Sequence, residues 1–136
     1  TENGPRLIEL GARMGGDCIT THLVPLSTGI DMVRAVIELS IGDKPNLAPK
    51  YNKSSAIRFF KGVKGVIKRI DGVDKAKQSN AIKEISFTKK VGDELGEIGS
   101  SVDRVGFVIS QTESVSEAIN ECENAVNSIK ILTYEK

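Results

Sequence analysis

The stretch IELGARMGGD, residues 8–17, decides the fold of this chain. It leads from apolar residues that favour a strand into a glycine pair that ends one. In an extended chain Glu9, Gly11 and Arg13 share one face, because side chains alternate between faces. A carboxylate, an arginine four residues later and then glycines offer a ligand for Mg²⁺, a forked cation for phosphate or carboxylate, and free N–H groups for an oxyanion. These parts suit phosphoryl chemistry, with a structural Glu–Arg salt bridge as the alternative.

The residues before this stretch predict a strand over residues 6–10, preceded by a turn. Asn3-Gly4 is the strongest two-residue hairpin signal, because both positions can adopt positive φ. Only two residues precede that turn, too few for the other strand of a hairpin. We therefore expect a chain cut from within a larger sheet, and a frayed N-terminus is the alternative.

The composition of the chain limits which partners and which cellular compartment we expect. The chain has 136 residues, 39% of them hydrophobic, which is enough for a core. Nineteen basic and eighteen acidic residues give a formal charge of +1, so we expect no nucleic-acid partner. The longest nearly apolar stretch, residues 30–41, is shorter than the roughly 18 residues of a membrane span, so no membrane partner is expected. Cys18, Cys122 and a single histidine predict two unpaired thiols in a reducing cytoplasm rather than a zinc site.

The first half of the chain holds one predicted helix. Residues 17–27 are interpreted as a loop or irregular strand. Residues 30–41 carry apolar side chains nearly all round, which is typical of a largely buried helix, with Thr28 as its cap and Gly42 and Pro45 at its end. Residues 45–53, rich in Pro, Asn and Lys, are a connector.

The second half alternates strand and helix patterns, so the predicted fold class is α+β. Strands are predicted over residues 55–60, 65–70, 81–88 and 104–110, with a short helix over residues 73–78. Ser114 and Glu117 form a capping box that opens an amphipathic final helix, and residues 130–134 add an edge strand. The apolar stripe of the final helix consists of Val115, Ala118, Ile119, Cys122, Ala125, Val126 and Ile129.

At these residues the chain resembles a known family. IELGARMGGD, then TTHLVPLSTGIDM and the helix from Ile30, resemble the closing part of the ATP-grasp fold in the branch of carboxylate–amine ligases that includes L-amino acid ligases. Carbamoyl-phosphate synthase and formate-dependent phosphoribosylglycinamide transformylase are related. GVIKRIDG, AIKEISF, VGDEL and DRVGFVISQ with the final helix resemble the small mixed-sheet C-terminal domain of these ligases. The resemblance implies an incomplete end of the ATP-grasp domain over residues 1–44, a connector over 45–53 and a small α+β domain over 54–136.

The resemblance also implies a reaction and a set of site residues. These ligases use ATP and Mg²⁺ to convert a carboxylate to an acyl phosphate, from which an amine displaces phosphate. Glu9 takes the place of the glutamate that bridges two Mg²⁺ ions, and Arg13 that of the arginine that holds the acyl phosphate or tetrahedral intermediate. Gly16 takes the place of a glycine that donates its backbone N–H. Gly11 departs from the pattern, since many members carry a metal-binding Asn there.

Other parts of such a site are expected outside this chain. Phosphate-binding lysines, the adenine pocket and a further acidic ligand belong to the preceding part of the family, so we expect the chain alone to be inactive. The expected partners are that nucleotide-binding half and small carboxylate and amine substrates. Association with further copies of the chain is left open. The alternatives are a non-catalytic interaction or assembly module, or one half of a split enzyme similar to carbamoyl-phosphate synthase.

Overall fold

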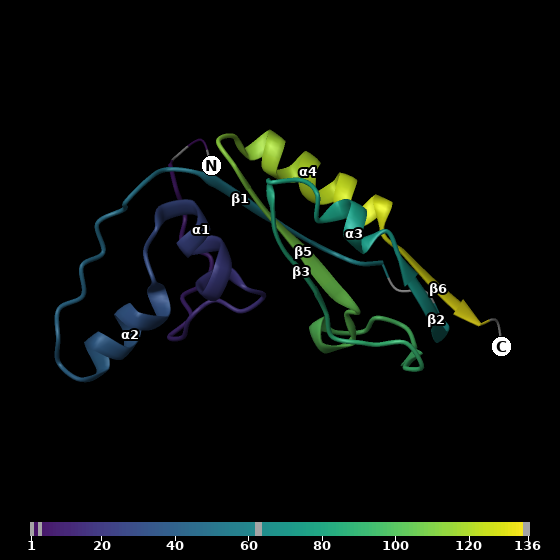
Figure 1. Cartoon of the computed structure of the whole chain (residues 1–136). Helices are drawn as coiled ribbons and strands as arrows, with labels where there is room; N and C mark the ends of the chain where they lie inside the picture. Colours follow the sequence, from purple (N-terminus) through teal and green to yellow (C-terminus); the bar gives the residue numbers. More distant parts are fainter. Residues whose placement is uncertain (1, 3, 62–63, 135–136) are drawn as a thin grey trace.

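The computed structural model describes residues 2, 4–61 and 64–134. Short helices occupy the N-terminal part, and antiparallel strands with one long helix occupy the remainder (Figure 1). Residues 41–53, which contain no helix or strand, join these two parts. The elements of the N-terminal part are a π-helix η1 (Ile19–Leu23) and the helices α1 (Val24–Thr28) and α2 (Met32–Ser40).

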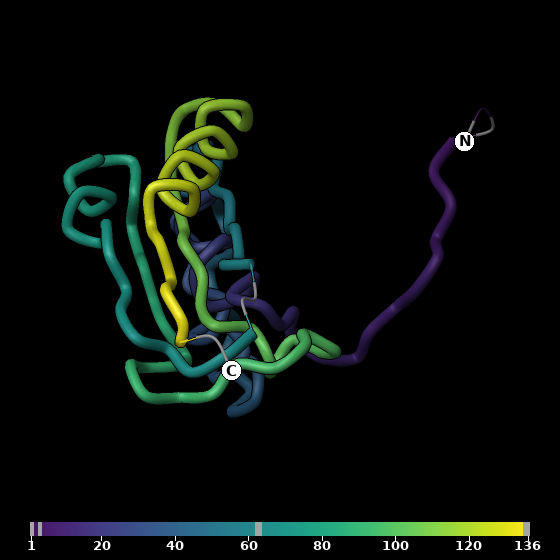
Figure 2. The backbone as a smooth tube through the Cα atoms, turned by 90° about the vertical axis from the view of Figure 1, so that its right-hand side faces the viewer, coloured from purple at the N-terminus to yellow at the C-terminus, as the bar shows by residue number. Residues whose placement is uncertain are grey.

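The predicted strand over residues 6–10 is not formed. This segment runs outward from the body of the chain (Figure 2) and has no neighbouring strand in the part that the structure describes. Leu7 is 81% exposed and Ile8 98% exposed. A strand needs a partner for its backbone N–H and C=O groups, and here none lies beside it. The predicted Asn3-Gly4 turn includes Asn3, which lies outside the described residues.

Two helical predictions need correction. Residues 17–27 are not a loop or irregular strand, because η1 and α1 occupy most of this stretch. The helix α2 is present but not largely buried: Ala35 is buried, whereas Ile37 is 58% and Leu39 57% exposed. Its N-cap is Asp31, whose carboxylate accepts from the N–H of Arg34, and not Thr28. The Thr28 hydroxyl instead donates to the C=O of Val24.

The strands form two antiparallel three-stranded sheets. The first has the order β1-β5-β3, and the second has the order β4-β2-β6. Sequence patterning predicted all of them except the short β4, with shifts of one or two residues at the ends. The strands are β1 (Ser54–Phe59), β2 (Gly65–Asp71), β3 (Ile82–Phe87), β4 (Glu94–Leu95), β5 (Gly106–Thr112) and β6 (Lys130–Tyr134).

The helix α4 (Val115–Ser128) packs on β1 and β5 and covers the core. Ser114 caps it by accepting from the N–H of Glu117. The predicted stripe faces inward, apart from Val115, which is 65% exposed beside the first turn. Two shorter elements complete the fold, the helix α3 (Val73–Ala76) and the 3₁₀ turn η2 (Ser101–Asp103). The buried residues of the core cluster are Ala56, Phe60, Ile67, Ala76, Leu95, Val105, Val108, Ala118, Cys122, Ala125 and Ile129.

Both cysteines are unpaired, as the sequence predicts. Cys122 is buried in the core, and Cys18 is half-buried next to η1. Among the helices of the described residues, none is long and apolar enough to cross a bilayer. The combination of short helices with antiparallel sheets agrees with the predicted α+β class.

Candidate functional site

The candidate site lies along one short segment that leads into η1. Glu9 is exposed on the outward-running segment, and Arg13 is exposed at the bend that follows it. The Arg13 guanidinium donates from Nη1 to the C=O of the adjacent Met14 at 3.1 Å. Within the described residues, Glu9 and Arg13 form no salt bridge with each other or with any other side chain. Neither charged group therefore has an ion-pair partner in the described part of the chain.

The glycine pair forms a tight turn at the start of η1. The N–H of Ile19 donates to the C=O of Gly16 at 2.9 Å, and the Thr20 hydroxyl donates to the C=O of Gly15 at 3.0 Å. A Cβ added at Gly16 would meet nothing within 4 Å. Among the described residues, no acceptor is bonded to the N–H of Gly16. Gly16 is exposed, so its unbonded N–H is available to donate to an oxyanion.

The residues after the glycines adopt a conformation that side chains rarely take. Asp17 has φ 49° and Cys18 has φ 62°, both in the left-handed region. Such a conformation costs about 1–2 kcal/mol for each residue other than glycine, although aspartate tolerates it better than most. It persists only where neighbouring contacts hold it. The backbone here is stabilised by hydrogen bonds from the N–H groups of His22 and Leu23 to the C=O of Cys18, at 2.9 and 3.0 Å.

Arg104 contacts this turn from the other half of the chain. Its Nη1 lies 2.8 Å from Oδ1 of Asp17, and its guanidinium carbon lies 4.0 Å from the centre of the Phe59 ring. The approach to Asp17 is an ion pair and not a well-aligned hydrogen bond, because Nη1 meets no acceptor in bonding geometry among the described residues. Sequence reasoning missed this contact, since no local pattern relates Asp17 to an arginine so far along the chain.

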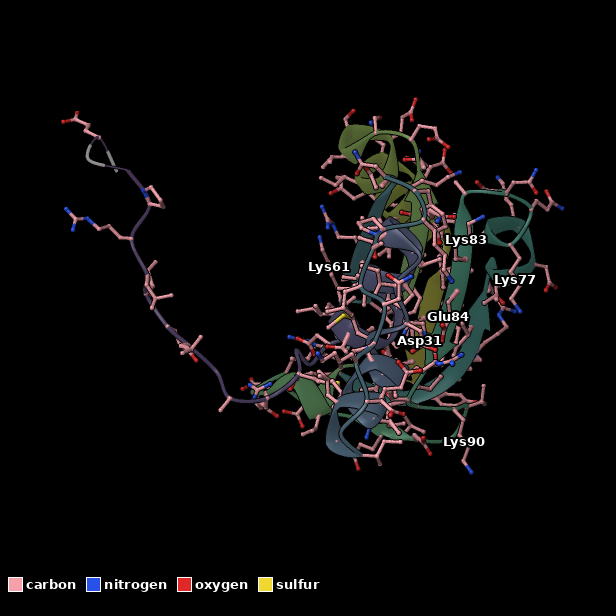
Figure 3. The ribbon with its side chains drawn as sticks, turned by 90° about the vertical axis from the view of Figure 1, so that its left-hand side faces the viewer. Asp31, Lys61, Lys77, Lys83, Glu84 and Lys90 are labelled. Atoms are coloured by element: carbon pink, nitrogen blue, oxygen red, sulfur yellow. The ribbon has the colours of Figure 1, made fainter. Side chains whose placement is uncertain are left out.

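A second polar contact joins the same two parts. Nε2 of His22 lies 2.9 Å from a carboxylate oxygen of Glu84 on β3, and Nδ1 of His22 is 2.7 Å from the Thr21 hydroxyl. Figure 3 shows Glu84 on the side of the sheet beside the N-terminal helices. His22 thereby fixes η1 to the sheet.

Polar contacts of α1 with the sheet strengthen this attachment. The Ser55 hydroxyl donates to the C=O of Leu23 at 3.0 Å and lies 2.7 Å from the Ser27 hydroxyl. The Gln111 side chain donates to the C=O of Leu26. The helices that follow the glycine turn are therefore held against the sheet β1-β5-β3.

Comparison with known proteins identifies the domain over these strands. The sequence profile of the L-amino acid ligase C-terminal domain 2 family matches residues 58–133, more than half of the chain. The chain belongs to this family. The match begins within β1 and ends within β6, so the family domain comprises both sheets together with α3 and α4.

Solved structures and a curated relative extend the comparison beyond the family domain. Phosphoribosylglycinamide synthetase from Anaerococcus prevotii is 26% identical with a TM-score of 0.80, over 93% of this chain and 33% of that one. L-amino acid ligase from Bacillus licheniformis, at 20% identity and a TM-score of 0.78, covers 98% of this chain and 34% of that one. An uncharacterised protein, y4rH, of Sinorhizobium fredii is 29% identical over 95% of this chain and 27% of its own length.

These comparisons confirm the resemblance and the fold class predicted from sequence. The chain corresponds to a C-terminal portion of an ATP-grasp ligase, with a mixed helix and sheet fold. It spans about a quarter of the curated relative and a third of the two solved chains. The family domain lies C-terminal to Glu9, Arg13 and Gly16, so its profile does not reach these residues.

The residues present suit a magnesium site only as a partial set of ligands. Among the described residues, His, Cys, Asp and Glu side chains do not gather in any group of three or more that would hold a metal. Mg²⁺ in phosphate-transferring sites is held by one or two carboxylates together with substrate phosphates. Glu9, exposed and unpaired with any cation of the described chain, fits the role of one such carboxylate.

The thiol nearest the turn is poorly suited to nucleophilic chemistry. Partial burial raises the pKa of Cys18, and the carboxylates of Glu84 and Asp17 raise it further by opposing a second negative charge. The thiol therefore keeps its proton at neutral pH, whereas the nucleophilic form is the thiolate.

Proposed function

We propose that this chain is the C-terminal portion of an ATP- and Mg²⁺-dependent ligase that joins a carboxylate to an amine through an acyl phosphate. The observation that carries the proposal is the joint presentation of Glu9, Arg13 and the Gly16 N–H on one exposed segment, in a chain of the ligase family. None of these groups has a partner elsewhere in the described chain that would explain it structurally. The free thiols are consistent with action in the cytoplasm.

Each of the three groups has a separate task in this proposal. Glu9 supplies a carboxylate to the metal ions that neutralise the transferred phosphoryl group. The planar fork of Arg13 binds two oxygens of the acyl phosphate and holds the reacting carbon in place for the amine. The N–H of Gly16 donates to the oxyanion that develops when the amine attacks. Phosphate then leaves, and the amide remains.

The proposal assigns nucleotide binding to a preceding half that this chain does not include. Lysines over the phosphates, an adenine pocket and further metal ligands are contributed there. The 136 residues by themselves are therefore expected to catalyse no ATP-dependent reaction. The acid and amine are expected to be small molecules, because the similar solved structures are an L-amino acid ligase and a phosphoribosylglycinamide synthetase.

Hydroxylamine trapping tests the proposal, because it converts an acyl phosphate to a stable hydroxamate. The protein in which this chain follows a nucleotide-binding half is incubated with ATP, Mg²⁺, hydroxylamine and a panel of amino acids and small carboxylic acids. We expect hydroxamate and ADP in equal amounts with at least one acid. The 136-residue chain alone is the control and should give neither. No hydroxamate with any acid would contradict the proposal.

One observation favours a second candidate, a non-catalytic assembly module. Apolar side chains are exposed on the outward-running segment, on α2 and at the residue that follows α2, namely Leu7, Ile8, Leu10, Ile37, Leu39 and Ile41. An unpaired apolar segment can add to the edge of another sheet. Light scattering of the 136-residue chain separates the candidates. Stable dimers or larger assemblies, together with failure of the trapping experiment, would favour the assembly module. They would count against both the ligase and the split enzyme.

A further inference from the structure

Arg104 of the family domain forms an ion pair with Asp17 in the turn that carries Gly16. The arginine follows η2 and lies with its guanidinium between the carboxylate of Asp17 and the face of Phe59. Its side chain is 28% exposed, and that of Asp17 is 49% exposed. The backbone of Arg104 is itself fixed, because its C=O accepts from the Thr88 hydroxyl at 2.5 Å. Contacts with the sheet therefore fix Arg104, and its guanidinium contacts the turn.

The turn needs such a contact because its conformation is strained. Asp17 and Cys18 are consecutive residues in the left-handed region, and the backbone bonds around them are all local. Local bonds close the turn, but they do not fix its direction relative to the sheet. Two contacts with the family domain do: the His22–Glu84 contact holds η1, which follows the turn, on β3, and the Arg104–Asp17 pair ties the strained residue next to Gly16 to the segment before β5.

We infer that Arg104 is a positioning residue, which holds the turn at residues 15–18 so that the Gly16 N–H and Arg13 face the reacting carboxylate. This inference rests on the proposed function. Arginine suits the task better than lysine, because its planar guanidinium can stack on Phe59 while it pairs with Asp17. The family domain contributes no reacting group to the proposed chemistry. Its role is to hold, through Arg104, the turn that carries Gly16.

A purely structural role for Arg104 makes a different prediction. If the pair only stabilises the fold, its loss lowers the melting temperature and leaves the direction of the turn unchanged. Arg58 provides the matched control, since it pairs with Glu123 of α4 at 3.0 Å inside the family domain and does not touch the turn. Arg58→Met removes a comparable ion pair but leaves the Arg104–Asp17 pair beside Gly16 intact.

Amide hydrogen exchange of the 136-residue chain tests the inference without any ligand. The N–H groups of Ile19, His22 and Leu23 report on the turn, because they donate to the C=O of Gly16 and Cys18. In Arg104→Met we expect their exchange to quicken about tenfold, while core amides of β5 keep their rates. Asp17→Asn should behave alike, because asparagine tolerates the left-handed region but lacks the charge. Arg104→Lys should recover part of the protection, and Arg58→Met should leave these amides unchanged.

Kinetics of the same variants in the complete ligase give the second readout. We expect kcat to fall about tenfold or more in Arg104→Met, with KM for ATP within twofold, because misplacing a donor affects the chemical step. Exchange at wild-type rates in both Arg104→Met and Asp17→Asn, or faster exchange with unchanged kcat, would overturn the inference. If Arg104→Met does not fold, Asp17→Asn decides. The two readouts can also separate. If the wild type and all variants lack ligase activity but exchange changes as expected, the proposed function is wrong, whereas the anchoring of the turn by Arg104 is confirmed.

Discussion

The Sγ atom of Cys122 lies 3.2 Å from the hydroxyl oxygen of Ser110, and this contact joins α4 to β5 inside the core. The Ser110 hydroxyl donates to the C=O of Ala118 at 2.6 Å. The thiol also approaches the C=O groups of Ala56 and Val108 at 3.3 and 3.4 Å. Polar atoms at this point are therefore satisfied within an otherwise apolar interface, and the helix has one registered position on the sheet.

The buried thiol gives stability a pH dependence. Burial raises the pKa of Cys122 and outweighs the hydrogen bonding with Ser110, which lowers it. The folded state thus retains the proton longer than the unfolded state, so the contribution to stability is present below the ordinary thiol pKa of about 8.5 and is lost as pH rises above it. Urea unfolding between pH 7 and 10, in a Cys18→Ser background, should show a steeper loss with Cys122 than with Cys122→Ser. Parallel curves would contradict this account.

Gly72 is expected to be the more costly of two glycines with similar backbone angles. Gly72 has φ 88° and Gly92 has φ 95°. A Cβ at Gly72 would lie 2.2 Å from the C=O oxygen of Ser128, whereas one at Gly92 would meet nothing within 4 Å. Gly92→Ala should therefore cost only the left-handed penalty, about 1–2 kcal/mol. Gly72→Ala should cost about 1–3 kcal/mol more, because backbone must move. Equal losses of unfolding free energy in urea for the two variants would show that the backbone around α3 moves at little cost.

The sequence predicts best the elements whose signals are local. The cap at Ser114 and the three-four spacing behind it place α4 correctly, because both signals depend on the helix itself. The predictions that fail are ones that depend on a neighbouring segment. Apolar spacing in α2 shows that a helix forms but not what covers Ile37. Likewise, residues 6–10 carry a strand pattern without a strand beside them in the described chain.

The residues of the candidate site also differ in whether a local sequence signal predicts them. Glu9, Arg13 and Gly16 follow from one contiguous motif, and the structure places them on one exposed segment and turn. Arg104 and Glu84 do not follow from the sequence, because their contacts with Asp17 and His22 exist only once the helices pack on the sheet. Residues 19–28 were missed as helices because threonines and a proline disfavour helix by propensity, and a π-turn followed by proline at the first turn of α1 accommodates them.

Arg13→Lys tests the assignment of the guanidinium fork. Lysine keeps the charge but loses the planar pair of donors, so we expect kcat of the complete ligase to fall roughly 10²-fold while KM for ATP changes little. The Arg13 side chain bonds only to the neighbouring Met14 among the described residues, so the melting temperature should stay within a degree or two.

Arg6 supplies the matched control for that substitution. It is exposed on the same outward-running segment and has no assigned role. Arg6→Lys should leave kcat and stability unchanged. If Arg13→Lys retains activity within a few-fold of wild type, Arg13 is not the acyl-phosphate ligand, and the assigned site is reduced to Glu9 and Gly16.

The central claim is that this chain contributes catalytic groups to a phosphoryl-transferring ligase, and Glu9→Gln tests it most directly. The measurement is the rate of hydroxamate formation by the complete protein as a function of Mg²⁺ concentration. An amide is a poorer ligand for a hard cation, so we predict loss of most turnover and a requirement for more Mg²⁺, with the free energy of unfolding changed by less than about 0.5 kcal/mol. Wild-type rates at every Mg²⁺ concentration would contradict the claim, because the chain would then contribute no ligand to the metal ions.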